Sequence, residues 1–193
     1  MDELPERLAR VAAKLRDAAA QPGEPVMFGA SSHGFRLGPP LSDDAVAEFE
    51  RGHGGVELPA DYRAFITTIG HGGPGPYGGA GPYYGLHPLD DWFHGYLNLS
   101  DAFLLARPFP VEPGHVPDDW DVDDIYQEPF RGTLALSDEG CGFMSLLVVS
   151  GPARGRVVGN NDETGPTFTG DPDFLSWYER WLDAVLAGRE HFR

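Results

Sequence analysis

The feature that most constrains the fold is a set of three short apolar segments that follow one another between residues 132 and 162. They read GTLALSDEG, GFMSLLVVSG and GRVVGNND, and only short turns separate them. In the link GPARG, Pro152 and Gly155 take the positions typical of a tight hairpin. Because FMSLLVV is apolar without alternation, we expect a central strand buried on both faces. The three segments therefore predict an antiparallel meander.

Helical patterns flank the meander at both ends of the chain. Apolar residues recur at spacings of four and three near the start, which predicts an amphipathic helix over residues 4–20. A second apolar face near the end predicts a closing helix, with Asp171 as its N-cap and Pro172 in its first position. The first face consists of Leu4, Leu8, Val11 and Leu15, and the second of Phe174, Tyr178, Trp181 and Val185.

Two more helices are expected before the meander. Ser42, followed by two aspartates, starts one over DDAVAEFERG, and Pro59 opens the next. Gly70 stands where a left-handed C-terminal cap belongs. Helices grouped around a mainly antiparallel sheet, and packed against one side of it, make an α+β fold.

Three further segments outside these helices and the meander have sequence patterns that predict local structure. PVMFGASSHGFRLG, residues 25–38, is typical of two short strands around a Ser-Ser-His-Gly turn, and residues 90–106 are interpreted as a helix. HGGPGPYGGAGPYYG, residues 71–85, contains a G-x-G-x-x-G pattern, but a helix precedes it and two prolines interrupt it. A phosphate cradle needs the opposite order, so we expect a long surface loop.

The amino-acid composition limits the classes of partner that the chain can bind and the compartment in which it is expected. The chain has 193 residues, enough for one domain, and its 30 acidic against 14 basic residues give a net charge of −16. Such a charge repels nucleic acid and anionic membranes and attracts basic macromolecules, although it also serves solubility alone. No apolar run approaches the length of a bilayer span, and a single cysteine fits a reducing compartment, so a cytoplasmic location is expected.

No catalytic, cofactor or metal site emerges from the motifs. Ser32 in ASSHG resembles a nucleophile elbow, but Pro39 and Pro40 exclude the helix that an elbow requires. Cys141 lies between glycines next to acidic residues, which disfavours a reactive thiol. The seven histidines form no H-x-x-x-H pair, and the aspartates of DDWDVDDIYQE miss the Gly and Glu of a calcium loop. An enzyme built on Ser32 or a histidine set is the least favoured hypothesis.

Several stretches together resemble the SUKH superfamily in its Smi/Knr-type branch. They are VAEFERGHGGVELPADYRAFITTIGHGG, YYGLHPLDDW, LSDEGCGFMSLLVVSGPARGRVV and FLSWYERWLDAVL. The resemblance covers a core over residues 42–187 and implies a single SUKH-like domain over residues 1–193, with residues 1–41 as an N-terminal extension of helix and hairpin. Members of that superfamily are mostly immunity proteins that neutralise polymorphic toxins, and others are regulatory or scaffold proteins. It has no catalytic motif to carry over.

The favoured hypothesis is a non-catalytic immunity protein that occludes a basic toxin domain, such as a nuclease, by stoichiometric binding. A regulatory or scaffold module with an endogenous partner is the alternative. The expected contact residues are aromatic and acidic side chains of the glycine-rich loop, residues 71–85, and of an acidic loop, residues 118–128, together with Trp92. They are Tyr77, Tyr83, Trp92, Asp118, Asp119, Trp120, Asp121, Asp123 and Asp124. Two alternatives remain open. The acidic loop is also interpretable as a plain solvated loop. The larger aromatic residues are also interpretable as core residues, namely Tyr84, Trp92, Trp177 and Trp181.

Overall fold

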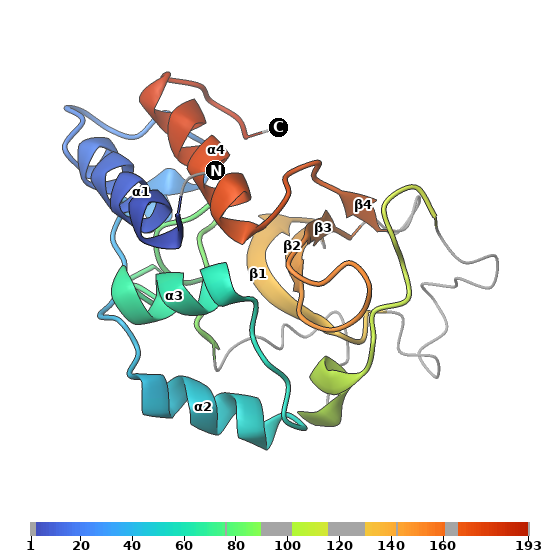
Figure 1. Ribbon diagram of the computed structural model, residues 1–193. Helices are drawn as coiled ribbons and strands as arrows, with labels where there is room; N and C mark the ends of the chain where they lie inside the picture. The colour runs from blue at the N-terminus through green and yellow to red at the C-terminus, as the bar shows by residue number, and fades with distance from the viewer. Residues whose placement is uncertain are drawn as a thin grey trace.

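The computed structural model describes residues 3–75, 77–89, 102–115, 130–141, 143–160 and 166–192, without the side chains of residues 102 and 103. Four α-helices, two 3₁₀ segments and four strands are described, and Figure 1 shows their arrangement. The helical elements are α1 (Leu4–Ala19), η1 (Ala30–Ser32), α2 (Asp43–Gly52), α3 (Ala60–Thr68), η3 (Ala102–Ala106) and α4 (Phe174–Leu186). The strands are β1 (Thr133–Gly140), β2 (Phe143–Val148), β3 (Val157–Gly159) and β4 (Thr167–Phe168).

The meander is confirmed as an antiparallel sheet in the order β1-β2-β3-β4. Neighbouring residues of β2 point to opposite faces, and both faces are covered. Leu147 packs into the larger core with the helices, whereas Leu146 and Val148 pack into a second cluster with Phe109 and Phe130. The non-alternating apolar run of β2 therefore reflects burial on both sides, as the sequence predicts.

The closing helix contributes the largest buried side chains of the core. Phe174, Tyr178, Trp181 and Val185 are all buried, as their spacing predicts, together with Trp177. The predicted N-cap is wrong by two residues. Asp173 has the extended backbone of a cap and accepts from the Ser176 N–H at 2.9 Å. Asp171 lies two residues before this cap, and its carboxylate instead binds the Arg180 guanidinium.

The first helix lies along α4, and α3 packs against both (Figure 1). Leu8, Val11 and Leu15 join the same core as α4, which confirms the amphipathic face. Cations of α1 pair with carboxylates along α4. The Arg7 guanidinium donates to both Asp173 oxygens, at 2.8 and 2.6 Å.

Further along this contact, Arg10 and Lys14 both pair with Glu179. The Arg10 hydrogen bond comes first among the causes that hold the pKa of Glu179 below its ordinary value, and Lys14 adds to it against partial burial. The interface between α1 and α4 is thus apolar at its centre and ion-paired along its edge.

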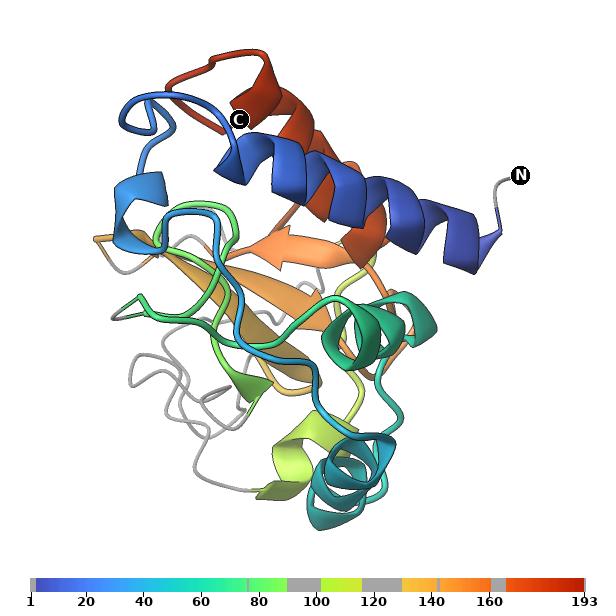
Figure 2. The same ribbon diagram turned by 90° about the vertical axis from the view of Figure 1, so that its left-hand side faces the viewer.

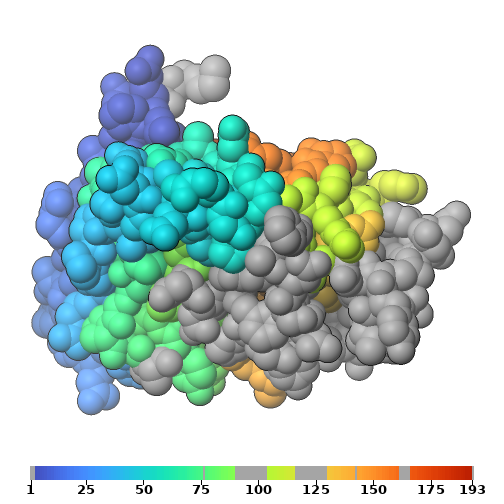
Figure 3. Space-filling model, turned by 90° about the horizontal axis from the view of Figure 1, so that it is seen from below, coloured from blue at the N-terminus to red at the C-terminus, as the bar shows by residue number. Residues whose placement is uncertain are grey.

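Helices α2 and α3 begin as the sequence predicts. The Ser42 hydroxyl accepts from the Ala45 N–H, and Pro59 is the N-cap of α3. Seen from below, the two helices lie beside the segment that includes residues 77–89 (Figure 3). Gly70 is not a left-handed cap, because its φ is not positive. Its requirement is steric: a Cβ there would lie 2.7 Å from both the Gly38 oxygen and the Leu37 Cβ.

The hairpin expected over residues 25–38 does not form. The chain makes the short η1 turn and joins a neighbouring segment only through an isolated bridge between Gly38 and His71. Gly29 has a φ of 79°, and the Ser32 hydroxyl hydrogen-bonds its carbonyl at 2.7 Å. These local hydrogen bonds hold the backbone in a turn, so the two halves never align as strands.

A candidate protein-interaction surface

The glycine-rich segment, residues 71–85, is only partly the surface loop that the sequence predicts: residues 73, 74 and 77 are exposed, whereas most of its second part belongs to the interior. Residues 78–82 and 85–87 are buried. Leu86 forms bridges with Gly79 on one side and with Ser137 of β1 on the other. The segment therefore covers the β1 edge of the sheet, which would otherwise leave backbone groups unpaired.

Close backbone approach explains the glycines there. A Cβ on Gly73 would overlap Gly79, and a Cβ on Gly79 would overlap the carbonyl of Gly72. Two passes of main chain lie in direct contact at this point, and a larger residue would separate them. The G-x-G-x-x-G pattern thus belongs to backbone packing, and its interpretation as something other than a phosphate cradle stands.

His33 connects the η1 turn to this segment. Its ring is fully buried. Nδ1 accepts from the Phe35 N–H at 3.0 Å, which leaves Nε2 to donate to the Gly81 carbonyl, also at 3.0 Å. Burial lowers the pKa of His33 to about 4, and the Gly81 hydrogen bond offsets only part of that effect. The ring is a neutral structural link at pH 7.

The same geometry removes Ser32 as a nucleophile. Its hydroxyl lies 2.7 Å from the Gly29 carbonyl oxygen and 3.2 Å from that of Tyr84. The adjacent His33 uses both ring nitrogens in other hydrogen bonds, so it offers no base to this hydroxyl. Within the described ranges, no group of three or more His, Cys, Asp or Glu residues is placed to hold a metal ion.

An aromatic patch lies where the η1 turn, the glycine-rich segment and the start of β2 meet. We define it by Phe28, Tyr77, Tyr84 and Phe143. Phe28 and Tyr77 are each 41% exposed and Phe143 is 38% exposed. The Tyr84 ring lies between the first two, with centroids 5.2 Å from Phe28 and 5.3 Å from Tyr77. Exposed aromatic side chains that support one another are typical of protein-binding surfaces.

Beside the patch lies an open hollow of about 280 Å³. The C-terminal tail forms one side of it, since the Phe28 N–H donates to the Glu190 carbonyl at 2.7 Å. Figure 2 shows this tail running back from α4 beside the loop that precedes η1. The lining residues are Phe28, Tyr83, Glu139, Phe143, His191 and Phe192.

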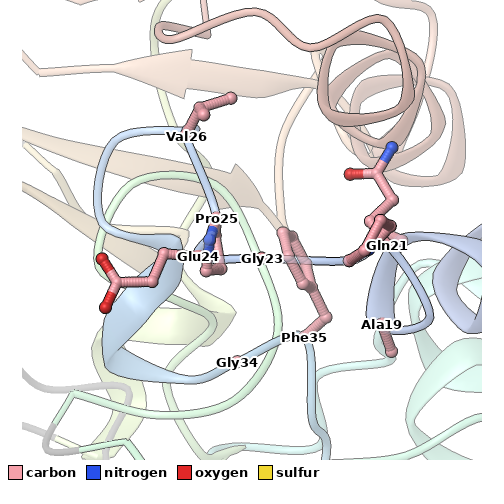
Figure 4. A pocket seen from close by; sticks show the side chains of 10 residues that line it. Ala19, Gln21, Gly23, Glu24, Pro25, Val26, Gly34 and Phe35 are labelled. Carbon is pink, nitrogen blue, oxygen red and sulfur yellow. The ribbon is translucent and has the colours of Figure 1, made fainter.

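Two other depressions carry less chemistry. One, of about 440 Å³, lies under the loop after α1, where Glu24 is the only charged lining residue and extends away from Gln21 (Figure 4). The other is an apolar groove of about 740 Å³ between α1 and α3, in which Arg16 is the only charged lining residue. Neither brings an acid and a base together, as an acid–base site would require.

A family model described as the SMI1 / KNR4 family (SUKH-1) matches residues 40–180. The chain belongs to this family. The matched residues run from just before α2 into α4, so they include the sheet and the glycine-rich segment. Comparisons with curated proteins and with solved structures gave no match. Among the described helices of this SUKH-1 chain, none is long and apolar enough to cross a membrane.

The contact residues predicted from the sequence fall into two groups. Tyr77 is exposed in the patch, whereas Tyr83 is half-buried and packs against Phe192 with a centroid distance of 6.0 Å. Trp92, Asp118, Asp119, Trp120, Asp121, Asp123 and Asp124 lie outside the described residues. Trp177 and Trp181 are buried in the core.

Sequence reasoning missed Phe28, Phe143 and Glu139. Phe28 lies in a segment that the sequence predicts to be a strand, and Phe143 lies in an apolar run that it predicts to be buried. One signal was available for Phe143: it directly follows the turn that includes Cys141, where a strand leaves the core. Only the tertiary fold brings it next to Phe28.

Proposed function

We propose that this SUKH-1 chain is a non-catalytic immunity protein that binds a basic toxin domain and occludes it. The aromatic patch carries the proposal, because it offers exposed anchors of the kind that dominate protein interfaces. Family membership supports it, since SUKH proteins often act as immunity proteins and are generally not enzymes.

Charge supplies the second support. The net charge of −16 attracts a cationic partner over long range and accelerates encounter at low salt. A basic substrate groove of a nuclease is one surface that such a protein would cover. The partner is a protein, and we expect the chain to act in the cytoplasm, where the toxin has to be neutralised.

The test is co-expression with the toxin domain encoded beside this gene. The wild-type chain is expected to restore growth and to co-purify with the toxin as a complex. Phe28→Asp and Tyr77→Asp should each weaken the complex at least tenfold, because each replaces an exposed ring of the patch by a charge. Thr68→Asp introduces the same charge at an exposed position in the groove between α1 and α3, and should leave protection intact.

Absence of both protection and a complex would refute the proposal. Equal loss in all variants would show that added negative charge, and not the patch, is responsible. Stoichiometric capture of an endogenous protein in place of a toxin would support a regulatory or scaffold module instead.

A further inference from the structure

The hollow beside the aromatic patch has a polar floor. Glu139, near the end of β1, accepts from the Ser145 hydroxyl at 2.8 Å. The Tyr83 hydroxyl is a second hydrogen-bond partner of this carboxylate and also lies 3.3 Å from the Phe192 carbonyl oxygen. Both are neutral groups, so the floor carries an acidic side chain held in one place by hydrogen bonds.

The groups that the structure describes around Glu139 determine its electrostatic environment. Burial raises the pKa of Glu139 above its ordinary value, hydrogen bonds from Ser145 and Tyr83 offset part of that rise, and the neighbouring Asp138 adds to it. Over the part of the chain that the structure describes, no lysine or arginine pairs with this carboxylate. By contrast, Asp173 and Glu179 each pair with cations of α1. A partly buried carboxylate without a counter-ion is costly, and a cation from outside would relieve that cost.

Aromatic rings form the walls above this floor. Phe28 and Phe143 stand at the exposed rim, and Tyr83 and Phe192 lie deeper. Cations bind favourably over aromatic rings, and this chain already uses the interaction: the Arg180 guanidinium carbon lies 4.3 Å from the Phe192 ring centroid. The charge of Arg180 is neutralised by Asp171, so it does not compensate Glu139.

Shape and chemistry favour an arginine side chain in the hollow. The hollow of about 280 Å³ is open and lies at the small end of the usual range of ligand pockets, about 300–1,000 Å³, so it has room for one long side chain. A guanidinium is planar, stacks on aromatic rings and donates to a carboxylate through two parallel N–H groups. Arginine therefore fits the floor and the walls better than lysine does.

We infer that this hollow receives an arginine side chain of the protein partner, with the guanidinium on the Glu139 carboxylate and its flat faces against the aromatic walls. The inference rests on the proposed function for the identity of the partner, but not for the chemistry of the hollow. It makes Glu139 the charged anchor at the edge of a surface whose other contacts are aromatic.

The chemistry is tested on the isolated full-length chain. Amide chemical shifts are followed by NMR during titration with the blocked peptide Ac-Gly-Arg-Gly-NH₂ and with the matched peptide in which neutral citrulline replaces arginine. The arginine peptide should give saturable shifts at residues 139, 143 and 191, with a Kd in the millimolar range expected for one side chain, about 1 mM. The citrulline peptide should give none.

Variants separate the carboxylate from general charge. Glu139→Gln should raise the Kd for the arginine peptide at least tenfold. The thermal stability of this variant should stay equal or rise, because a neutral amide removes the partly buried charge. Glu48→Gln removes the same charge from an exposed position of α2 and should leave the Kd unchanged. Equal shifts with both peptides, no shifts at all, or an unchanged Kd in Glu139→Gln would each overturn the inference.

Three further outcomes distinguish a free from a protein-borne guanidinium and separate this inference from the proposed function. Free L-arginine binding more tightly than the blocked peptide would overturn the docking role, since the hollow would then serve a small molecule. Arginine-peptide binding that survives a failure of toxin protection would refute the immunity role and leave the hollow intact. Protection that is unaffected by Glu139→Gln at limiting expression would refute the use of the hollow in docking.

Discussion

Replacing His33 by glutamine tests the claim that a neutral, buried imidazole connects the η1 turn to the glycine-rich segment. The ring is fully buried, and its two nitrogens are engaged by the Phe35 N–H and the Gly81 carbonyl. Burial comes first among the causes that lower the pKa of His33 from 6.5 to about 4. Glutamine keeps a hydrogen-bonding group of similar length and does not titrate.

The direction and size of the pH effect follow from that difference. A base with a lower pKa in the folded than in the unfolded state binds more protons when unfolded. Its contribution to stability is complete above pH 6.5 and is lost as the pH falls toward 4. The full difference corresponds to about 3 kcal/mol, of which about 2 kcal/mol is lost by pH 5.

Urea unfolding of the wild type and His33→Gln at several pH values from 7.5 to 5 measures this contribution. All other titrating groups are common to both proteins, so their effects largely cancel in the difference between the two free energies of unfolding. The wild-type advantage at pH 7.5 should shrink by about 2 kcal/mol at pH 5. A difference that does not change with pH would refute the neutral buried histidine.

Other substitutions test packing and pairing by thermal or urea unfolding. Gly29→Ala should lower the free energy of unfolding by over about 1 kcal/mol more than Gly55→Ala does. Both glycines have positive φ, but only a Cβ at position 29 would overlap a carbonyl, that of Tyr83. Equal losses in the two variants would contradict that contact. Tyr178→Phe should lower the free energy of unfolding by about 1–3 kcal/mol, because it leaves the buried Ala80 carbonyl without its hydrogen-bond donor. Unchanged stability would show that water replaces the lost hydroxyl. Arg7→Met should lower the free energy of unfolding by about 1 kcal/mol, and by less in high salt, which screens the ion pair. Asp173→Ala should lower it by more, because that carboxylate also caps α4. The reverse order would contradict the cap.

The helices and the meander were predictable because their signals are local. Apolar spacing placed Leu8, Val11 and Leu15 on the buried face of α1, and short links between apolar runs forced β1, β2 and β3 to be antiparallel. These patterns depend only on the periodicity of helices and strands. Chain order then sufficed to indicate an α+β fold.

Errors occurred where local rules allow several outcomes. Asp171 and Asp173 are both acceptable caps, and packing of α4 against α1 selects the one that Arg7 reaches. Gly70 and Gly79 were interpreted through turn and loop chemistry, but neighbouring backbone from distant sequence explains them. Contacts of that kind leave no periodic trace.

The sequence by itself determined the fold class, the main helical faces, the antiparallel order of the strands and the strongly acidic charge. Only the tertiary structure decided that the second part of the glycine-rich segment is buried beside β1, and that Phe28, Glu139 and Phe143 share one hollow. The reason is physical: helix and strand periodicity is set by bonds between near neighbours, whereas a binding surface is set by which distant backbones approach closely enough to share it.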